Sequence, residues 1–132
     1  MIYTQSLRKF CFALAIVTTV IFSCGNARAA ELIVFEQAGC PWCAAFDHEI
    51  APIYPKTEEG KRAPLRRVDI TRPLPPDLAF IEVERLTPLF VMVEEGRELG
   101  RIRGYPGEDH FWGLLSVLIA RLDAVQAGRK RE

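Results

Sequence analysis

The sequence has little of what several functional classes require. Its 17 basic residues are balanced by 17 acidic ones, so the formal net charge is zero. This argues against a nucleic-acid-binding protein, because such a protein needs a basic face. The chain has only two histidines, His48 and His110, and only four cysteines. The histidines lie far apart without ligand spacing, and a structural zinc site needs four ligands, so we expect no bound metal.

Length and composition set a second limit. With 132 residues the chain has room for one domain, and it shows no internal repeat. Hydrophobic residues make up 49% of the sequence and charged residues 26%, which is typical of a globular protein. We therefore expect a single globular unit.

The one long hydrophobic run lies near the N-terminus. Two basic residues precede an apolar stretch over residues 10–23, and a small-x-small cleavage pattern, Ala27-Arg28-Ala29, follows it. These features predict a secretory signal peptide over residues 1–29, removed after Ala29 or Ala30. An uncleaved membrane anchor is the alternative, but the run is shorter than the roughly 18–20 residues that span a bilayer. A lipoprotein signal ending at Cys24 is a second alternative.

Removal of this segment would change the cysteine count. Cys11 and Cys24 would be lost, which leaves Cys40 and Cys43 as the only thiols of the remaining domain, residues 30–132. A single pair is not a disulfide framework. Because disulfides persist in exported proteins, we expect the pair to function in the periplasm. The domain would also lose three basic residues and no acidic ones, so it would carry a small negative charge.

The two remaining cysteines form the motif Cys40-Pro41-Trp42-Cys43, around which the chain is organised. The motif follows a continuous apolar run, Leu32–Phe35, and it opens a segment with helical spacing over about residues 41–50. Two thiols separated by two residues on the first turn of a helix can close into a disulfide and open again. The motif therefore predicts a thiol–disulfide exchange site.

The position of the two thiols on that helix predicts different roles for them. A helix N-terminus offers unpaired N–H groups and the positive end of the dipole, and both favour a thiolate. We therefore expect Cys40 to attack the disulfide of a partner protein. Cys43 lies one turn inward, and we expect it to be buried and to resolve the mixed disulfide. A purely structural disulfide is the alternative for this pair.

The rest of the chain predicts an α/β domain with the element order β-α-β-α-β-β-α. Strands are expected over residues 31–35, 65–70, 89–93 and 98–103, and helices over about 41–50, 78–85 and 108–124. The first and third strands are apolar throughout, which indicates strands buried on both faces. A helix connects the first two strands, so these should be parallel, with a right-handed crossover.

Smaller features refine these expectations. Asp77 is expected to cap the second helix, and residues 56–59 to add a helical turn before Gly60. Gly96 is expected to turn the hairpin between the third and fourth strands, with the fourth at the sheet edge. Residues 128–131 are expected to form a frayed tail after the last helix. The apolar stripe of that helix is expected to comprise Phe111, Leu114, Leu115, Leu118, Ile119 and Leu122.

On these residues the chain resembles the thioredoxin superfamily. The resemblance rests on Leu32–Phe35 followed by the Cys40–Cys43 motif, on Thr87-Pro88 directly before the third strand, and on Gly104 after the fourth. It implies a minimal thioredoxin-like fold with a central four-stranded mixed sheet flanked by helices. It also implies that Pro88 is cis and lies against the disulfide, and that the backbone of Thr87 pairs with the substrate peptide. An ordinary trans proline is the alternative for Pro88.

The predicted signal peptide, the small size and the Cys-Pro-Trp-Cys motif are similar to the SoxS-type periplasmic thioredoxin-like proteins of bacterial sulfur-oxidation clusters. This resemblance implies a reductase of protein disulfides that takes electrons from a membrane thiol carrier. We expect it to act as a monomer without a bound cofactor. Pro41 and Trp42, with Thr87 and Pro88, are expected to contact the substrate. Thioredoxin has a buried aspartate where this chain has Val34, and Glu36 is the candidate to replace it.

Three alternatives remain open at the level of sequence. The first is an oxidase or isomerase that makes or reshuffles disulfides. The second is a glutathione-dependent enzyme of the glutaredoxin type. The third is a binding or regulatory module that keeps the thioredoxin fold without catalysis.

Overall fold

The computed structural model describes residues 29–132 of the chain. The predicted signal peptide lies outside the described residues except for Ala29, as do Cys11 and Cys24. The cleavage of residues 1–29 and the domain boundary at residue 30 therefore stay predictions.

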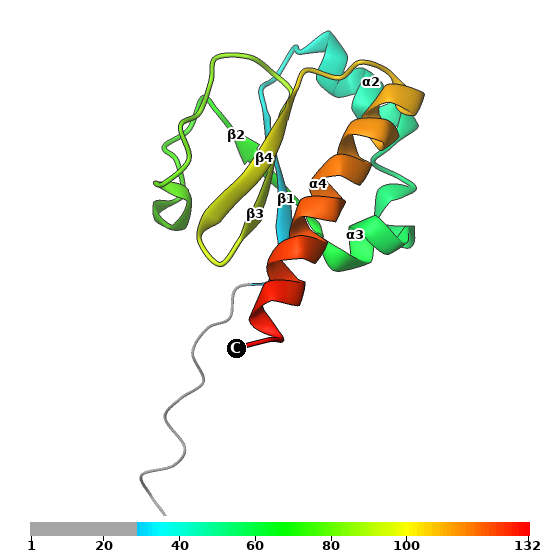
Figure 1. Cartoon of the computed structure of the whole chain (residues 1–132). Coiled ribbons are helices and arrows are strands. Elements are labelled where there is room, and N and C mark those ends of the chain that lie inside the picture. Colours follow the sequence, from blue (N-terminus) through cyan, green and yellow to red (C-terminus); the bar gives the residue numbers. More distant parts are fainter. Residues whose placement is uncertain (1–28) are drawn as a thin grey trace, which may run out of the picture.

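A four-stranded mixed sheet forms the centre of the described structure (Figure 1). Its strands are β1 (Glu31–Glu36), β2 (Leu65–Asp69), β3 (Leu89–Glu94) and β4 (Arg97–Arg103), in the order β2-β1-β3-β4. The β1–β2 pair is parallel, while β3 is antiparallel to both β1 and β4. The central strands β1 and β3 are buried along almost their whole length, which explains their unbroken apolar sequence. The predicted minimal thioredoxin-like fold is thereby confirmed.

Three helices pack against one face of this sheet. They are α2 (Pro41–Glu49), α3 (Glu58–Arg62) and α4 (Glu108–Arg129). Phe46 of α2 and Phe111 of α4 meet Phe90 of β3, with ring centroids 4.8–5.4 Å apart. This aromatic cluster holds the cysteine-bearing helix α2 against the sheet, since buried aromatic pairs stabilise beyond the area they bury.

The opposite face of the sheet is covered by an irregular segment, residues 70–88, which we call the covering segment. Leu74, Leu78, Ile81 and Val83 of this segment pack on the second core cluster, formed with β1 and β3. The predicted helix over residues 78–85 is wrong: only the short 3₁₀ turn η2 (Pro76–Leu78) forms there. The carboxylate of Asp77, which was expected to cap this helix, binds the guanidinium of Arg66 on strand β2.

The helical region after α2 also differs from the prediction. A 3₁₀ turn, η1 (Tyr54–Lys56), precedes α3, and α3 begins after Thr57 and runs through Gly60. The Thr57 hydroxyl accepts the Gly60 N–H at 3.0 Å and donates to the Tyr54 carbonyl at 2.8 Å. This threonine cap sets the start of α3 two residues later than expected.

The last helix is longer than predicted. α4 continues to Arg129, whose guanidinium binds the buried carboxylate of Glu94 at 2.6 Å and also Glu95. The expected frayed tail is therefore wrong for the first two of its residues. Leu114 is exposed, which removes it from the predicted stripe, whereas Phe111, Leu115, Leu118 and Leu122 are buried. By length and composition alone α4 would also suit a membrane span, but its buried face packs on the sheet.

The hairpin between β3 and β4 confirms the sequence prediction. Glu95 and Gly96 both have positive φ, at 50° and 72°. Two central residues with positive φ are typical of the turn that matches the twist of a two-residue hairpin. Strand β4 lies at the edge of the sheet, also as predicted.

Candidate functional site

The two cysteines lie where the first strand leads into the first helix of the described chain. Strand β1 ends at Glu36, a short loop follows, and Cys40 is the N-cap of α2. Pro41 occupies the first helical turn, where its missing N–H would have no partner and its fixed φ suits a helix. Cys43 lies three residues further on, almost one helical turn away, and is 6% exposed.

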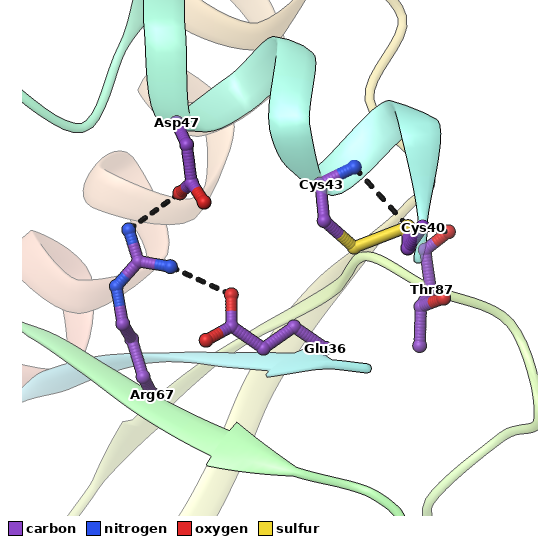
Figure 2. Close-up of a disulfide and its surroundings, with 6 residues drawn as sticks. All are labelled: Glu36, Cys40, Cys43, Asp47, Arg67 and Thr87. Carbon is purple, nitrogen blue, oxygen red and sulfur yellow. Dashed lines mark hydrogen bonds and ion pairs between the residues drawn. A yellow bond between two sulfur atoms is a disulfide. The ribbon is translucent and has the colours of Figure 1, made fainter. Parts of the chain in front are cut away.

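Cys40 and Cys43 are joined by a disulfide, with their Cα atoms 5.3 Å apart (Figure 2). The Sγ atom of Cys40 accepts the backbone N–H of Cys43 at 3.1 Å. When the disulfide is reduced, this N–H and the positive end of the helix stabilise a thiolate on Cys40. The asymmetry between a half-buried Cys40 and a buried Cys43 is the one that the sequence predicts for an attacking and a resolving thiol.

The covering segment reaches the site at its C-terminal end. The Thr87–Pro88 peptide bond is cis, as the resemblance implied, and the Thr87 carbonyl oxygen lies 3.5 Å from the Sγ atom of Cys40. A carbonyl at this position accepts a hydrogen bond from a protonated thiol and gives none to a thiolate. Two backbone groups therefore act on Cys40 in opposite directions, one from α2 and one from the covering segment.

The remaining predicted contact residues are placed around the sulfur atoms. Trp42 is 62% exposed, so its ring is free to meet another molecule. Pro41 is exposed as well, whereas Pro88 is buried and Thr87 is half-buried. The structure thus brings Cys40, Cys43 and Thr87 together, while contact of these residues with a substrate stays a prediction.

A cavity of about 300 Å³ opens beside the disulfide. Cys40 and Cys43 line it together with three carboxylates, those of Glu36, Asp47 and Asp69. In Figure 2 the first two carboxylates and Thr87 lie on opposite sides of the disulfide. The cavity is therefore an acidic flank of the site, with the Thr87 backbone on the other flank.

Arg67 organises this acidic flank from strand β2. Its guanidinium binds the carboxylate of Glu36 at 2.6 Å and that of Asp47 at 2.6 Å. Asp69 is held separately by the hydroxyl and N–H of Thr71 at 2.7 and 2.8 Å, and these hydrogen bonds lower the pKa of the Asp69 carboxyl. Glu36 thus lines the same cavity as Cys43, and its replacement of the buried aspartate stays a prediction.

The position of Val34 explains why this chain has no carboxylate at the place of thioredoxin's buried aspartate. Val34 is fully buried in the core under α2, where its side chain is part of the apolar cluster. Asp47 could have been found in the sequence, because it follows Cys43 by four residues on the same helical face. Arg67 could not, because its place opposite Val34 depends on the register of β1 and β2.

No metal-binding cluster of three or more His, Cys, Asp or Glu side chains is found within residues 29–132. His48 and His110 are both exposed and belong to different helices, α2 and α4. The absence of a bound metal stays a prediction.

Several proteins of solved structure resemble this chain. No protein-family model matches the chain, and no curated protein matches it either. Among solved structures, the periplasmic thioredoxin SoxS from Paracoccus pantotrophus is 47% identical, with a TM-score of 0.66, and the match covers 70% of this chain and 98% of that one. The thioredoxin Mala s 13 from Malassezia sympodialis is 19% identical with a TM-score of 0.50, covering 68% and 75%. The second likeness concerns the fold alone.

Proposed function

This chain belongs to the thioredoxin family, and on that premise we propose that it is exported to the periplasm and reduces disulfides of partner proteins there. Its general activity is thiol–disulfide exchange through Cys40 and Cys43. The observation that carries the proposal is the N-cap position of Cys40, whose Sγ atom accepts the Cys43 N–H. This contact favours the thiolate, which is the nucleophile in disulfide exchange.

The reaction begins with the reduced pair. The Cys40 thiolate attacks one sulfur of a partner disulfide, forms a mixed disulfide and releases the other partner sulfur as a thiolate, which takes up a proton. The Cys43 thiol then loses its proton and attacks the Sγ atom of Cys40. The second partner sulfur leaves as a thiolate, which takes up a proton from water, and the Cys40–Cys43 disulfide remains. Two electrons have moved from the pair to the partner.

The proton of Cys43 needs an acceptor in the second step. Glu36 lines the same cavity as Cys43, and its carboxylate binds the guanidinium of Arg67, 2.6 Å away. A carboxylate in this place can take the proton directly or through a water molecule in the cavity. We assign this function to Glu36, with Arg67 orienting its carboxylate.

The oxidised pair must then be reduced again. We propose that a dithiol of a membrane thiol carrier supplies the two electrons through the reverse exchange, so that no bound cofactor is needed. The likeness to a periplasmic thioredoxin supports the periplasm as the compartment. Exposed Trp42 and the Thr87 backbone are the proposed contacts for the partner segments that approach Cys40. We propose that the protein acts as a monomer.

The experiment that tests the direction is a measurement of the reduction potential. The purified protein is equilibrated in glutathione or dithiothreitol buffers, and its thiols are counted. A potential near the roughly −270 mV of thioredoxin supports a reductase, whereas one near the roughly −120 mV of a strong periplasmic oxidant makes the protein a disulfide donor instead. The mass of the protein after export tests cleavage at Ala29 or Ala30.

A further inference from the structure

The covering segment is attached by ion pairs to both edge strands of the sheet. In its first half, Asp77 binds Arg66 of strand β2 at 2.7 and 3.1 Å. Near its end, Glu84 binds Arg101 and Arg103 of strand β4. This segment has no α-helix, only the short 3₁₀ turn η2, so these side chains, together with its buried apolar residues, fix its path across the sheet.

The attachment at Glu84 is the more extensive of the two. The Nη1 atom of Arg101 lies 2.7 Å from the carboxylate of Glu84 and 3.2 Å from the carbonyl oxygen of Glu82. Arg103 makes three further contacts with the Glu84 carboxylate, at 2.8–3.0 Å. The hydrogen bonds from Arg103, and then those from Arg101, lower the pKa of the Glu84 carboxyl, so it stays ionised at neutral pH.

Arg101 is itself well fixed. Its side chain is only 16% exposed, and Glu98 binds its Nε and Nη2 atoms at 2.6 Å each. A guanidinium that is locked by packing and a second carboxylate is a rigid anchor, because little rotamer entropy is left to lose. Glu84 is therefore held by one well-packed guanidinium, that of Arg101, and by the more exposed guanidinium of Arg103.

The chain between this anchor and the reactive sulfur is short. Thr87 follows Glu84 by three residues, and its carbonyl oxygen lies 3.5 Å from the Sγ atom of Cys40. On the other side, Gly104 N–H donates to the Pro88 carbonyl at 2.8 Å, next to the pairing of Leu89 with Arg103. Thr87 is thus bracketed between strand pairing after it and the Glu84 ion pairs before it.

We propose that Glu84, clamped by Arg101 and Arg103, is a positioning residue that fixes the Thr87 backbone beside Cys40. The clamp has two consequences. It keeps the Thr87 carbonyl where it stabilises the protonated thiol against the thiolate. It also holds the Thr87 backbone in one conformation for pairing with a partner segment, so binding loses less entropy. The second consequence rests on the proposed function, whereas the first concerns the thiol alone.

The test compares the protein with its Glu84→Gln variant, which removes the charge and keeps the size. The first readout is the pH midpoint at which the Cys40 thiolate forms, followed by its ultraviolet absorbance in the reduced protein. We expect the midpoint to fall, because a displaced Thr87 carbonyl no longer favours the protonated form. The second readout is insulin reduction, for which we expect KM to rise about tenfold while kcat changes less than about twofold.

Asp123→Asn is the matched control. It removes another arginine–carboxylate pair, between Arg62 and Asp123, which does not touch the covering segment. We expect neither readout to move in this variant. If Glu84→Gln leaves both the thiolate midpoint and KM at the values of Asp123→Asn, the clamp does not position Thr87 and the proposal is overturned.

Arg103→Gln keeps the proposal testable if Glu84→Gln fails to fold. This variant leaves Arg101 bound to Glu84, so we expect smaller changes of the thiolate midpoint and of KM in the same direction. If neither quantity changes in Arg103→Gln, the clamp is rejected. The double variant Glu84→Gln/Arg103→Gln should be no more affected than Glu84→Gln alone, because both changes break the same unit. If the unmodified protein does not reduce insulin, the proposed function fails, while the thiolate midpoint still decides on the clamp.

Discussion

Cys43 donates its backbone N–H to the Sγ atom of Cys40 at 3.1 Å, so the residue that we propose as the resolving thiol also supports the proposed nucleophile. The contact exists because Cys40 caps helix α2 and Cys43 contributes one of the helix's first, otherwise unpaired N–H groups. Since the contact uses the backbone of Cys43, it survives replacement of the Cys43 side chain. The two functions of Cys43 can therefore be separated by mutation.

The first prediction concerns the two cysteines. Cys40→Ser should abolish insulin reduction, because it removes the nucleophile. Cys43→Ser should keep the first step and accumulate mixed disulfides with partner proteins, because the resolving thiol is gone while the supporting N–H remains. Non-reducing electrophoresis with mass spectrometry checks this. Residual turnover in Cys40→Ser would reject the assignment, and turnover in neither the variants nor the parent would favour a binding module.

The second prediction concerns the carboxylate beside Cys43. Glu36→Gln should slow the release of a partner from the mixed disulfide by about 100-fold, because it removes the proposed acceptor for the Cys43 proton. Single-turnover release of a thiol leaving group, started from the preformed mixed disulfide, measures this step. Asp69→Asn on the rim of the same cavity is the control and should release at the parental rate. If Glu36→Gln releases the partner as fast as Asp69→Asn, Glu36 is not the acceptor of the Cys43 proton.

The third prediction concerns the turn before α3. A Cβ atom at Gly60 would lie 1.9 Å from the backbone carbonyl oxygen of Tyr54, so Gly60→Ala forces the 3₁₀ turn and α3 apart. We expect a loss of roughly 1–3 kcal/mol in the free energy of unfolding, similar to overpacking of a core. Gly113→Ala in α4 is the matched control. Its Cβ meets nothing within 4 Å, and it should be neutral or stabilise by up to about 1 kcal/mol. Urea unfolding of both variants decides.

The fourth prediction concerns alkaline pH. Burial, and secondarily the charge of Glu59, raises the pKa of Tyr54 well above its ordinary value of about 10. Between the unfolded and the folded pKa the native state binds more protons, so stability falls as pH rises above about 10. Tyr54→Phe should reduce this fall. At neutral pH it should cost about 1–3 kcal/mol, because the Ala63 carbonyl loses the Tyr54 hydroxyl, 2.7 Å away.

Chemical denaturation at neutral pH and at pH above about 10 tests this point. Tyr105 also has a raised pKa, caused first by burial and then by its hydrogen bond to Glu49. Some alkaline loss of stability should therefore remain in Tyr54→Phe. If the pH dependence of stability is the same in Tyr54→Phe as in the parent protein, ionisation of Tyr54 does not contribute to the alkaline loss of stability.

Much of the site was predictable because its determinants are local in sequence. The helix start after Cys40 follows from Pro41, and the burial of Cys43 follows from its spacing to Phe46. The cis bond at Pro88 could be expected only from the family resemblance, because nothing in the local sequence distinguishes it from a trans proline. The two central strands, β1 and β3, could be predicted because the residues on both of their faces are apolar.

The rest depended on contacts between residues distant in sequence. The local sequence pattern favoured a helix over residues 78–85. In the structure, Asp77 forms an ion pair with an arginine of β2, and Glu84 forms ion pairs with two arginines of β4. The length of α4 was underestimated because the partners of Arg129 lie in the β3–β4 hairpin. Arg67 was missed for the same reason. Ion pairs of this kind depend on strand order and register, which single-sequence patterns do not encode.

The unequal covering of the two faces of the sheet divides the molecule mechanically. On one face lie three helices with internal hydrogen-bond ladders, and aromatic rings in tilted and edge-on contact hold α2, the helix that Cys40 caps. On the other, a segment without such ladders carries Thr87. Segments of the second kind open at lower free energy than helices packed in the core. The proposed nucleophile thus belongs to the helical half of the protein, whereas the Thr87 backbone belongs to the half without α-helices, where the Glu84 ion pairs and the hydrogen bond from Gly104 to Pro88 supply the support that helical hydrogen bonds give on the other face.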